Sequence, residues 1–278
     1  MDAVVEVKDL WFRYPGADSW ALRGVNFSLK PGERVAIIGQ NGGGKTTLAK
    51  NINGLLKPTK GVVLVDGLDT RTTPTHEIVK RVGYVFQNPS HQIFESKVRD
   101  EVAYGPRNLG LSEEEVNERV KWALSLVGLE GFEDHNPYDL DYGKMKLLTV
   151  ASVLAMKPKV LILDEPTTGQ DHAGRHVLAK LVKGLNDEGF TIVVITHDMR
   201  FVAEVAERTV LVAEGQILLD GPTREVLYAV DVLRKAAIKP PQIVQLSLIL
   251  RDKGIPLNAI TLDEAVKEIS EIVKSKTH

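Results

Sequence analysis

One eight-residue segment constrains this chain more than any other part of its sequence: Gly39-Gln40-Asn41-Gly42-Gly43-Gly44-Lys45-Thr46. It fits the pattern G-x-x-x-x-G-K-[ST], which is typical of a phosphate-binding loop. The apolar run 34–38 precedes it as a strand, and residues 47–50 read as the start of a helix. A chance match in a glycine-rich turn is the alternative, but the flanking strand and helix argue against it. The sequence therefore predicts a nucleotide site in an α/β protein.

Each part of this loop has an expected role. Its glycines allow backbone N–H groups to converge on phosphate oxygens, and the helix N-terminus adds its positive dipole end. Lys45 is expected to reach the β- and γ-phosphates, and the Thr46 hydroxyl to coordinate Mg²⁺. The nucleotide-binding residues predicted here are Asn41, Gly42, Gly43, Gly44, Lys45, Thr46 and Thr47.

A second candidate motif is an apolar strand that ends in two acids, Val160-Leu161-Ile162-Leu163-Asp164-Glu165. Alone, it is equally a strand that runs into a polar loop. Beside a phosphate loop, Asp164 is expected to hold Mg²⁺, usually through water, and Glu165 to orient or deprotonate the attacking water. Two carboxylates are needed because one that is tied to a metal ion is a poor base.

Several other segments have the pattern of regular structure. Buried-type strands are expected at 34–38, 159–163 and 191–195, and N-terminal strands at 4–10, 11–14 and 26–29. Each buried-type strand ends in polar or glycine residues, and ligands of parallel sheets bind at that end. Helices are expected from a Ser112–Glu115 capping box to Gly128, over residues 141–156, and from Thr261 onward.

Composition excludes several classes of protein. The chain has 278 residues, no cysteine, and 35 Lys and Arg against 37 Asp and Glu, for a formal charge of −2. Disulfides and thiolate sites are therefore excluded, and the balance of charge argues against a nucleic-acid partner. No run approaches the roughly 20 apolar residues of a membrane span, so other chains would have to supply any span.

Four further residues, in order along the chain, give the sequence a family resemblance: Tyr14, Gln87, Asp171 and His197. Together with the two motifs they make residues 4–220 resemble ABC ATPases. The resemblance implies that Tyr14 stacks on adenine and that Gln87 joins the site to a helical subdomain and contacts metal and water. It also implies that His197 contacts the γ-phosphate and that Asp171 lies in a loop that crosses a dimer. Singly, each has a plainer explanation: a core aromatic for Tyr14, a loop residue for Gln87, a helix cap for His197.

The resemblance also implies an architecture. We expect a RecA-like α/β P-loop NTPase core with an antiparallel β subdomain, a helical subdomain over about 88–157, and a small C-terminal extension. The ATPase domain would span 1–221, and 222–278 would be a dimerisation segment. The implied cofactors are ATP and Mg²⁺. The implied partners are transmembrane transporter subunits and a second ABC ATPase, with the chain peripheral on the cytoplasmic face of the membrane.

Three segments are similar to the energy-coupling-factor branch, which imports vitamins or cobalt and nickel: 87–94, 100–106 and 238–242. Two other classes of function are kept beside this one. The first is a soluble ABC ATPase that acts on DNA or ribosomes, although such proteins carry coiled-coil insertions or two cassettes that this chain lacks. The second is a regulatory nucleotide-binding module, against which the intact Lys45, Glu165 and His197 argue.

One motif departs from the family. ABC ATPases complete each site with the partner's signature, usually Leu-Ser-Gly-Gly-Gln, whereas this chain has Leu140-Asp141-Tyr142-Gly143-Lys144. An ionised Asp141 only accepts hydrogen bonds, and at about 4 Å from a phosphate charge the repulsion reaches ~4 kcal/mol at an effective dielectric near 20. Lys144 could offset this charge by pairing with Asp141, and a purely structural helix-capping role for Asp141 is the alternative. The hypothesis is an asymmetric pair, in which a partner with an ordinary signature completes this chain's site.

Overall fold

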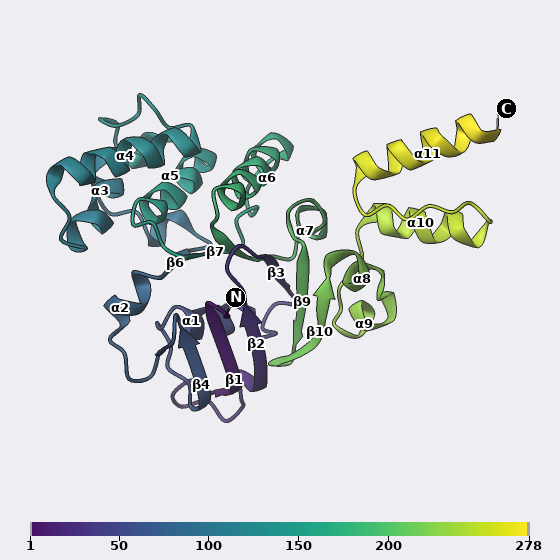
Figure 1. The fold of residues 1–278 in the computed structure, drawn as a ribbon, viewed down its shortest axis with the longest axis horizontal. Helices are drawn as coiled ribbons and strands as arrows, with labels where there is room; N and C mark the ends of the chain where they lie inside the picture. The colour runs from purple at the N-terminus through teal and green to yellow at the C-terminus, as the bar shows by residue number, and fades with distance from the viewer. Residues whose placement is uncertain (1, 277–278) are drawn as a thin grey trace.

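The computed structural model describes residues 2–276 and places two β-sheets on either side of a shared core (Figure 1). The larger sheet has six strands in the order β10-β9-β3-β8-β7-β6, and only β10 is antiparallel to its neighbour. Its strands are β3 (Arg34–Ile38), β6 (Val82–Val85), β7 (Val160–Asp164), β8 (Thr191–Ile195), β9 (Arg208–Ala213) and β10 (Gln216–Pro222). The buried strands predicted at 34–38, 159–163 and 191–195 are confirmed, the second shifted by one residue.

The smaller sheet is antiparallel, with the order β2-β1-β4-β5. Its strands are β1 (Val5–Phe12), β2 (Leu22–Leu29), β4 (Lys60–Val65) and β5 (Leu68–Asp69). Helix α1 (Lys45–Ile52) buries Leu48, Ala49 and Ile52 in the core that both sheets share. The phosphate loop, which leads into α1, is thereby fixed between two layers.

The prediction of two separate strands at 4–10 and 11–14 is wrong. One strand, β1, runs to Phe12, with a bulge where Asp9 adopts φ 46°. Tyr14 lies outside it because the chain turns there, with the Ala17 N–H donating to the Tyr14 carbonyl at 3.1 Å. Pro15 follows and has no N–H to offer a sheet ladder.

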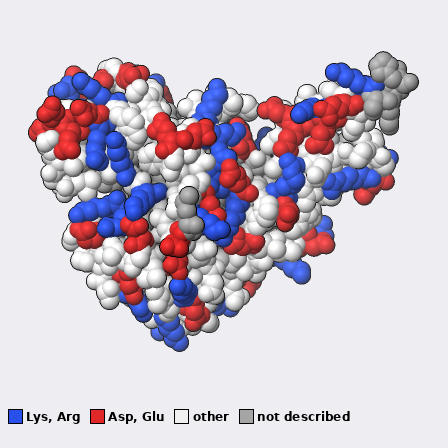
Figure 2. All heavy atoms as spheres, viewed as in Figure 1, with Lys and Arg blue, Asp and Glu red and all other residues white. Residues whose placement is uncertain are grey.

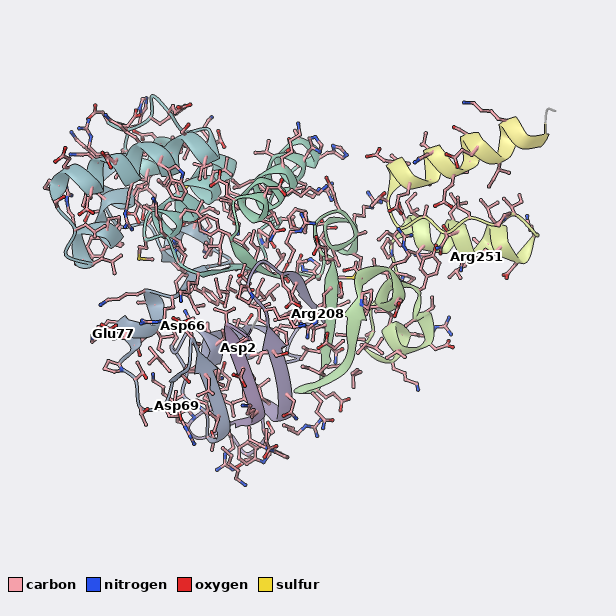
Figure 3. The ribbon with its side chains drawn as sticks, viewed as in Figure 1. Asp2, Asp66, Asp69, Glu77, Arg208 and Arg251 are labelled. Carbon is pink, nitrogen blue, oxygen red and sulfur yellow. The ribbon has the colours of Figure 1, made fainter. Side chains whose placement is uncertain are left out.

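Arg208 ties the two sheets together (Figure 3). From β9 it donates to Asp220 on β10 at 2.6 Å, and to the Ser28 carbonyl on β2 at 2.9 Å. It also pairs with Glu33 at 3.1 Å. These contacts hold β2 beside the edge of the larger sheet.

Helices cluster in the region 88–157: α3 (Val98–Asn108), α4 (Glu113–Val127) and α5 (Tyr142–Leu154), with short 3-10 turns at Pro89–His91 and Pro137–Asp139. The predicted capping box is confirmed, since the Ser112 and Glu115 side chains each accept the other's backbone N–H. Gly128 ends α4 with φ 71°. Buried residues of these helices, such as Val102 and Leu148, pack in one core with Leu161 of β7.

The remaining helices are α2 (Thr75–Val79), α6 (His172–Asp187), α7 (Met199–Val205), α8 (Thr223–Tyr228), α9 (Val230–Lys235), α10 (Gln242–Asp252) and α11 (Leu262–Lys276). Val226 and Leu233, from α8 and α9, pack with Ile38 of β3, so the core continues past residue 221, where the predicted ATPase domain was expected to end. By contrast, α10 and α11 extend to one side of the body (Figure 1) around a small core of Leu257, Ala259 and Ala265. Among residues 2–276, no helix has the length and hydropathy of a membrane span.

Candidate functional site

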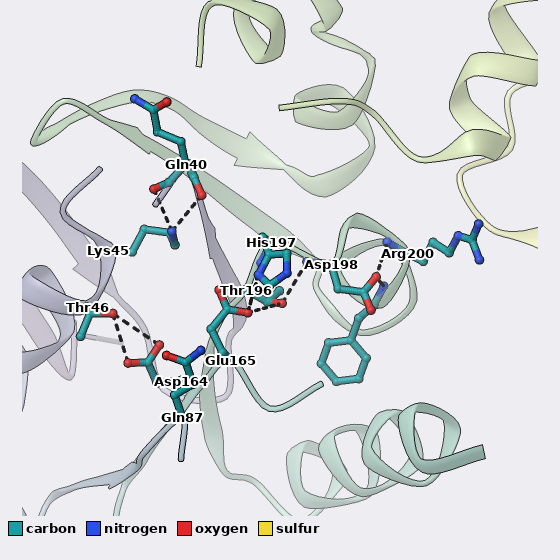
Figure 4. Close-up of polar contacts among 12 residues, drawn as sticks. Gln40, Lys45, Thr46, Gln87, Asp164, Glu165, Thr196, His197, Asp198 and Arg200 are labelled. Carbon is teal, nitrogen blue, oxygen red and sulfur yellow. Dashed lines mark hydrogen bonds and ion pairs between the residues drawn. The ribbon is translucent and has the colours of Figure 1, made fainter. Parts of the chain in front are cut away.

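The candidate site lies where β3, β7 and β8 end, as expected for a parallel sheet (Figure 4). Strand β3 leads into the phosphate loop, β7 ends with Asp164 and Glu165, and β8 leads to Thr196 and His197. The residues predicted from two separate motifs are therefore brought together.

The phosphate loop is shaped by its glycines and by Lys45. A Cβ atom on Gly39 would lie 2.0 Å from the Val212 carbonyl oxygen, and one on Gly44 2.9 Å from that of Ala21. No other residue fits at either position. The Lys45 ammonium donates to the carbonyls of Gly39 at 2.8 Å and Gln40 at 3.1 Å. Burial lowers the Lys45 pKa, against the opposing effect of Glu165 and Asp164.

Asp164 is buried and is held by two hydroxyl groups. Tyr84 donates to its Oδ2 at 2.5 Å, and Thr46 lies 3.1 Å from the same atom. Burial raises the pKa of Asp164, and these two hydrogen bonds act in the opposite direction. A desolvated carboxylate beside a hydroxyl oxygen is a donor pair that suits Mg²⁺, which supplies the missing positive charge and prefers oxygen ligands. Asp164 and Thr46 therefore fit the predicted metal site. The bond from Tyr84 was not predicted, although Tyr84 stands in an apolar strand-like run.

Glu165 is held in an unusual backbone conformation. Its φ is 47°, a left-handed value that is uncommon outside glycine, and its side chain is only 9% exposed. Its N–H donates to the Ile195 carbonyl at 2.8 Å. Its Oε2 lies 2.9 Å from His197 Nδ1 and 3.2 Å from the Thr196 hydroxyl (Figure 4). The carboxylate is thus oriented by two groups from the end of β8, and strain at such a residue is typical of functional sites.

Tyr14 and Gln87 lie at the edges of the site. The Tyr14 hydroxyl is 3.0 Å from the Thr47 hydroxyl, and the tyrosine is 42% exposed, so it is not a core aromatic. Gln87 follows β6, whose last residue Val85 pairs with Leu163, the neighbour of Asp164 on β7. The Gln87 backbone carbonyl accepts a hydrogen bond from the buried Lys146, a contact that no sequence motif predicted.

The signature residues form a separate group. Asp141 caps α5 by accepting the Lys144 N–H at 2.9 Å, and it pairs with the Lys144 ammonium at 2.5 Å. The pKa of Asp141 is lowered chiefly by that side-chain contact. Both roles that the sequence suggested for Asp141, the ion pair with Lys144 and the helix cap, are therefore present. Residues of this group and of the following loop line a cavity of about 390 Å³: Asp141, Tyr142, Gly143, Lys144, Gly169, Gln170 and Asp171 among them.

Tyr142 and Asp171 each have a contact within the chain. The Tyr142 ring lies over Gly169, where an added Cβ would come within 2.7 Å of it. Asp171 caps α6 by accepting the Gly174 N–H at 2.7 Å. Leu140 is buried in the helical core. The predicted dimer-facing residues are thus physically adjacent, and Lys45, Asp164 and Glu165 do not line their cavity.

Comparison with known proteins agrees with this geometry. Residues 22–168 match the family described as ABC transporter. The chain belongs to the ABC transporter ATP-binding family. It is 44% identical to the energy-coupling factor transporter ATP-binding protein EcfA of Methanocaldococcus jannaschii, over 98% of this chain and 99% of that protein. It is 41% identical to EcfA2 of Clostridium perfringens, over 92% of each chain.

Solved structures give the same result. The structure of cbiO1 from Clostridium perfringens, described as part of the ABC transporter complex cbiONQ, superposes with a TM-score of 0.77 at 37% identity, covering 88% of this chain and 99% of that one. A dimeric ATP-binding cassette in a post-hydrolysis state with ADP and Pi superposes with a TM-score of 0.71 at 30% identity, covering 79% of this chain and 98% of that one. The predicted fold class and the ATPase activity of this family are confirmed.

Glu165→Gln tests the role given to this carboxylate. We expect the steady-state ATPase rate to fall by about 10²–10⁴, the range for loss of a general base, because the amide accepts no proton. Nucleotide affinity, measured by fluorescence titration, should change less than about threefold, since the phosphate loop is untouched. Glu188→Gln, at an exposed position after α6, is the matched control. A Glu165→Gln variant with full turnover would show that another group activates the water.

Proposed function

We propose that this chain is the ATP-hydrolysing subunit of an energy-coupling-factor importer of vitamins or of a metal ion such as cobalt or nickel. The observation that carries the proposal is the extent of similarity. The M. jannaschii EcfA protein matches 98% of this chain, whereas the dimeric cassette with ADP and Pi covers 79%. What the chain shares with the transporter subunit thus includes more than a cassette core. A soluble ABC ATPase or a regulatory module is the alternative.

The reaction that the site supports is in-line attack of water on the γ-phosphate of ATP. Lys45 and the amides of residues 41–44 would stabilise charge on the phosphates, and Tyr14 would stack on the adenine. Glu165 accepts or orients the proton of the attacking water, while His197 fixes the carboxylate and contacts the γ-phosphate. Mg²⁺ bound at Thr46 and Asp164, with Gln87 beside them, would neutralise phosphate charge. No other chemistry is required of the protein.

A membrane subunit would dock beside the segment that follows Gln87. Three aromatic residues there are exposed: Phe94 by 59%, Tyr104 by 47% and Tyr138 by 55%. The Phe94 and Tyr104 rings meet edge to face at 4.7 Å. The loop is rigid, because the buried Glu101 accepts the N–H groups of Phe94 and Glu95 at 3.0 and 2.9 Å. An exposed aromatic surface on a fixed support, in the segment that follows Gln87, suits a partner that must sense ATP. That partner would place the chain on the cytoplasmic face of the membrane.

The double variant Phe94→Ala/Tyr104→Ala tests this docking surface. We expect co-purification with the membrane subunits in detergent to fall at least tenfold, because aromatic anchors dominate such interfaces. Basal ATPase activity should stay within twofold. Leu218→Ala, an exposed apolar residue on β10, is the control and should bind normally. Binding unchanged in the double variant would place the membrane partner elsewhere.

The C-terminal segment would join two cassettes. Helices α10 and α11 expose a set of apolar residues: Leu246, Ile249, Leu262, Val266 and Ile269. They belong to a small unit that extends to one side of the body, with charged residues of both signs around it (Figure 2). A second copy, or a related cassette with the same extension, would bury these residues. The signature residues would also act on the nucleotide of such a second cassette, since the cavity they line includes no residue of the chain's own phosphate loop.

Val266→Asp tests this segment. A charge in an apolar interface should raise the dimer dissociation constant at least tenfold, measured by light scattering over a dilution series. The neighbouring Lys267→Glu changes charge outside the apolar face and should leave the constant nearly unchanged. If both variants dimerise like the wild type, the segment does not form the dimer.

The signature supports an asymmetric pair. The contacts of Asp141 use both its oxygens within its own helix, and a carboxylate has no proton to donate. Tyr142 adds a ring where the family has glycine. A site completed by these residues would be weak, while this chain's own Lys45, Glu165 and His197 would work beside a partner with an ordinary signature. A homodimer would carry two weak sites.

The double variant Asp141→Ser/Tyr142→Gly tests this asymmetry in the purified chain. We expect the wild type alone to be nearly silent and the repaired chain to turn over ATP cooperatively, at least tenfold faster. The measurement is steady-state ATPase rate against ATP concentration. Robust cooperative turnover by the wild type alone would refute the asymmetric pair and favour a homodimer.

A further inference from the structure

Helix α5 buries a lysine among apolar residues. Lys146 is 1% exposed, although it is one of the longest side chains in the protein. Its neighbours on the helix, such as Leu148 and Val150, belong to the hydrophobic core. Burial of an ammonium group is costly, so its partners explain why it is there.

The Lys146 ammonium joins three segments of the chain. It donates one short hydrogen bond to the backbone carbonyl of Gln87, and another to the carbonyl of Glu165 at 3.2 Å. Gln87 follows β6 and Glu165 follows β7, whereas Lys146 comes from α5. The negative charges of Asp164 and Glu165 partly offset the desolvation of this ammonium.

A second contact ties the same helix to the same segment. The Gln92 side chain donates to the Thr149 carbonyl at 2.9 Å and to the Ser152 hydroxyl at 3.1 Å. It also accepts the Phe86 N–H at 3.1 Å. The segment 86–92 is therefore fixed to α5 by two side chains, Lys146 and Gln92. Of these two, Lys146 is the one that also bonds to Glu165.

The position of Glu165 depends on few backbone contacts. Its left-handed φ of 47° is unfavourable and must be held by its surroundings. Within the part of the chain described, its N–H bonds to Ile195, and its carbonyl accepts from Lys146 and from the Thr168 N–H at 3.2 Å. Removing the ammonium loosens one of these contacts and frees the Gln87 carbonyl.

We propose that Lys146 is a positioning residue for ATP hydrolysis, which couples the helix that bears the signature to Gln87 and Glu165 of the same subunit. Lys144 and Lys146 lie two residues apart within one turn of α5, so a shift of the signature against a partner's nucleotide moves the ammonium with it. The carbonyls that it binds carry this shift to the water-activating residues. The proposal rests on the ATPase reaction and not on the transported substrate.

Lys146→Met tests this proposal, because it keeps the length of the side chain and removes its N–H donors. In the assembly that hydrolyses ATP, we expect kcat to fall at least tenfold while KM and the nucleotide Kd stay within about threefold. The melting temperature should fall, because two backbone carbonyls and the buried Asp164 and Glu165 lose a positively charged neighbour. A purely structural lysine would lower the melting temperature in the same way but would leave kcat normal in the folded fraction.

Two further variants sharpen the result. Thr149→Val is the control: it removes a buried hydroxyl that donates to the Lys146 carbonyl of the same helix at 2.7 Å, and it should leave kcat within twofold.

Gln87→Ala combined with Lys146→Met should lose less activity than the product of the two single losses, because Lys146 acts on the water through the position of Gln87. Fully multiplicative losses, or a Lys146→Met enzyme with normal kcat, would overturn the proposal. If Lys146→Met fails to fold, Lys146→Gln decides by the same criterion: lower kcat at unchanged KM supports it, and unchanged kcat overturns it.

Discussion

Two carboxylates and two ammonium groups are buried together where β7 ends, and the rest of the site depends on their balance. Asp164 and Glu165 are only 6% and 7% exposed, while Lys45 and Lys146 are 7% and 1% exposed. Neither pair could be buried alone at reasonable cost, because isolated charges lose their hydration. Each lysine approaches from a different element, α1 or α5, and bonds to backbone carbonyls. Charge balance thus orders the loop, the acidic strand and the signature helix with respect to one another.

This arrangement gives the subunit two distinct surfaces. The first is the phosphate loop with Asp164, Glu165 and His197, which acts on the nucleotide that the chain itself binds. The second is the N-terminus of α5 with the loop before α6, whose residues line a separate cavity. The contact of Tyr142 with Gly169 joins the two elements of that second surface. Since Asp141 caps α5 and Lys146 of the same helix bonds to the Glu165 carbonyl, one helix contacts both surfaces.

Much of the fold and most of the site could be predicted from the sequence, because the decisive signals are local. A phosphate loop, an apolar strand ending in acids and a capping box each lie within eight consecutive residues, and all three took the predicted form. The contacts of Tyr84 and Lys146 could not be predicted, because they depend on the positions of β6 and α5 in the tertiary structure. A lysine in a helix ordinarily faces water, so the sequence of α5 gave no sign of its burial. The end of β1 at Phe12 could not be predicted either, because a turn hydrogen bond from the Ala17 N–H to the Tyr14 carbonyl, and not the hydrophobic pattern, decides where the strand ends.

The small core of α10 and α11 has a consequence for how such subunits diversify. Its residues Leu257, Ala259 and Ala265 pack among themselves and with Ile243 and Leu250, and contribute nothing to the core beneath the nucleotide. With the pairing role proposed for this segment, substitutions there would alter which cassettes recognise each other while the chemistry stays unchanged. Selection would then act on partner choice and on catalysis through separate sets of residues. A duplicated cassette gene could acquire a new pairing preference first, and lose one signature only after a complementary partner exists.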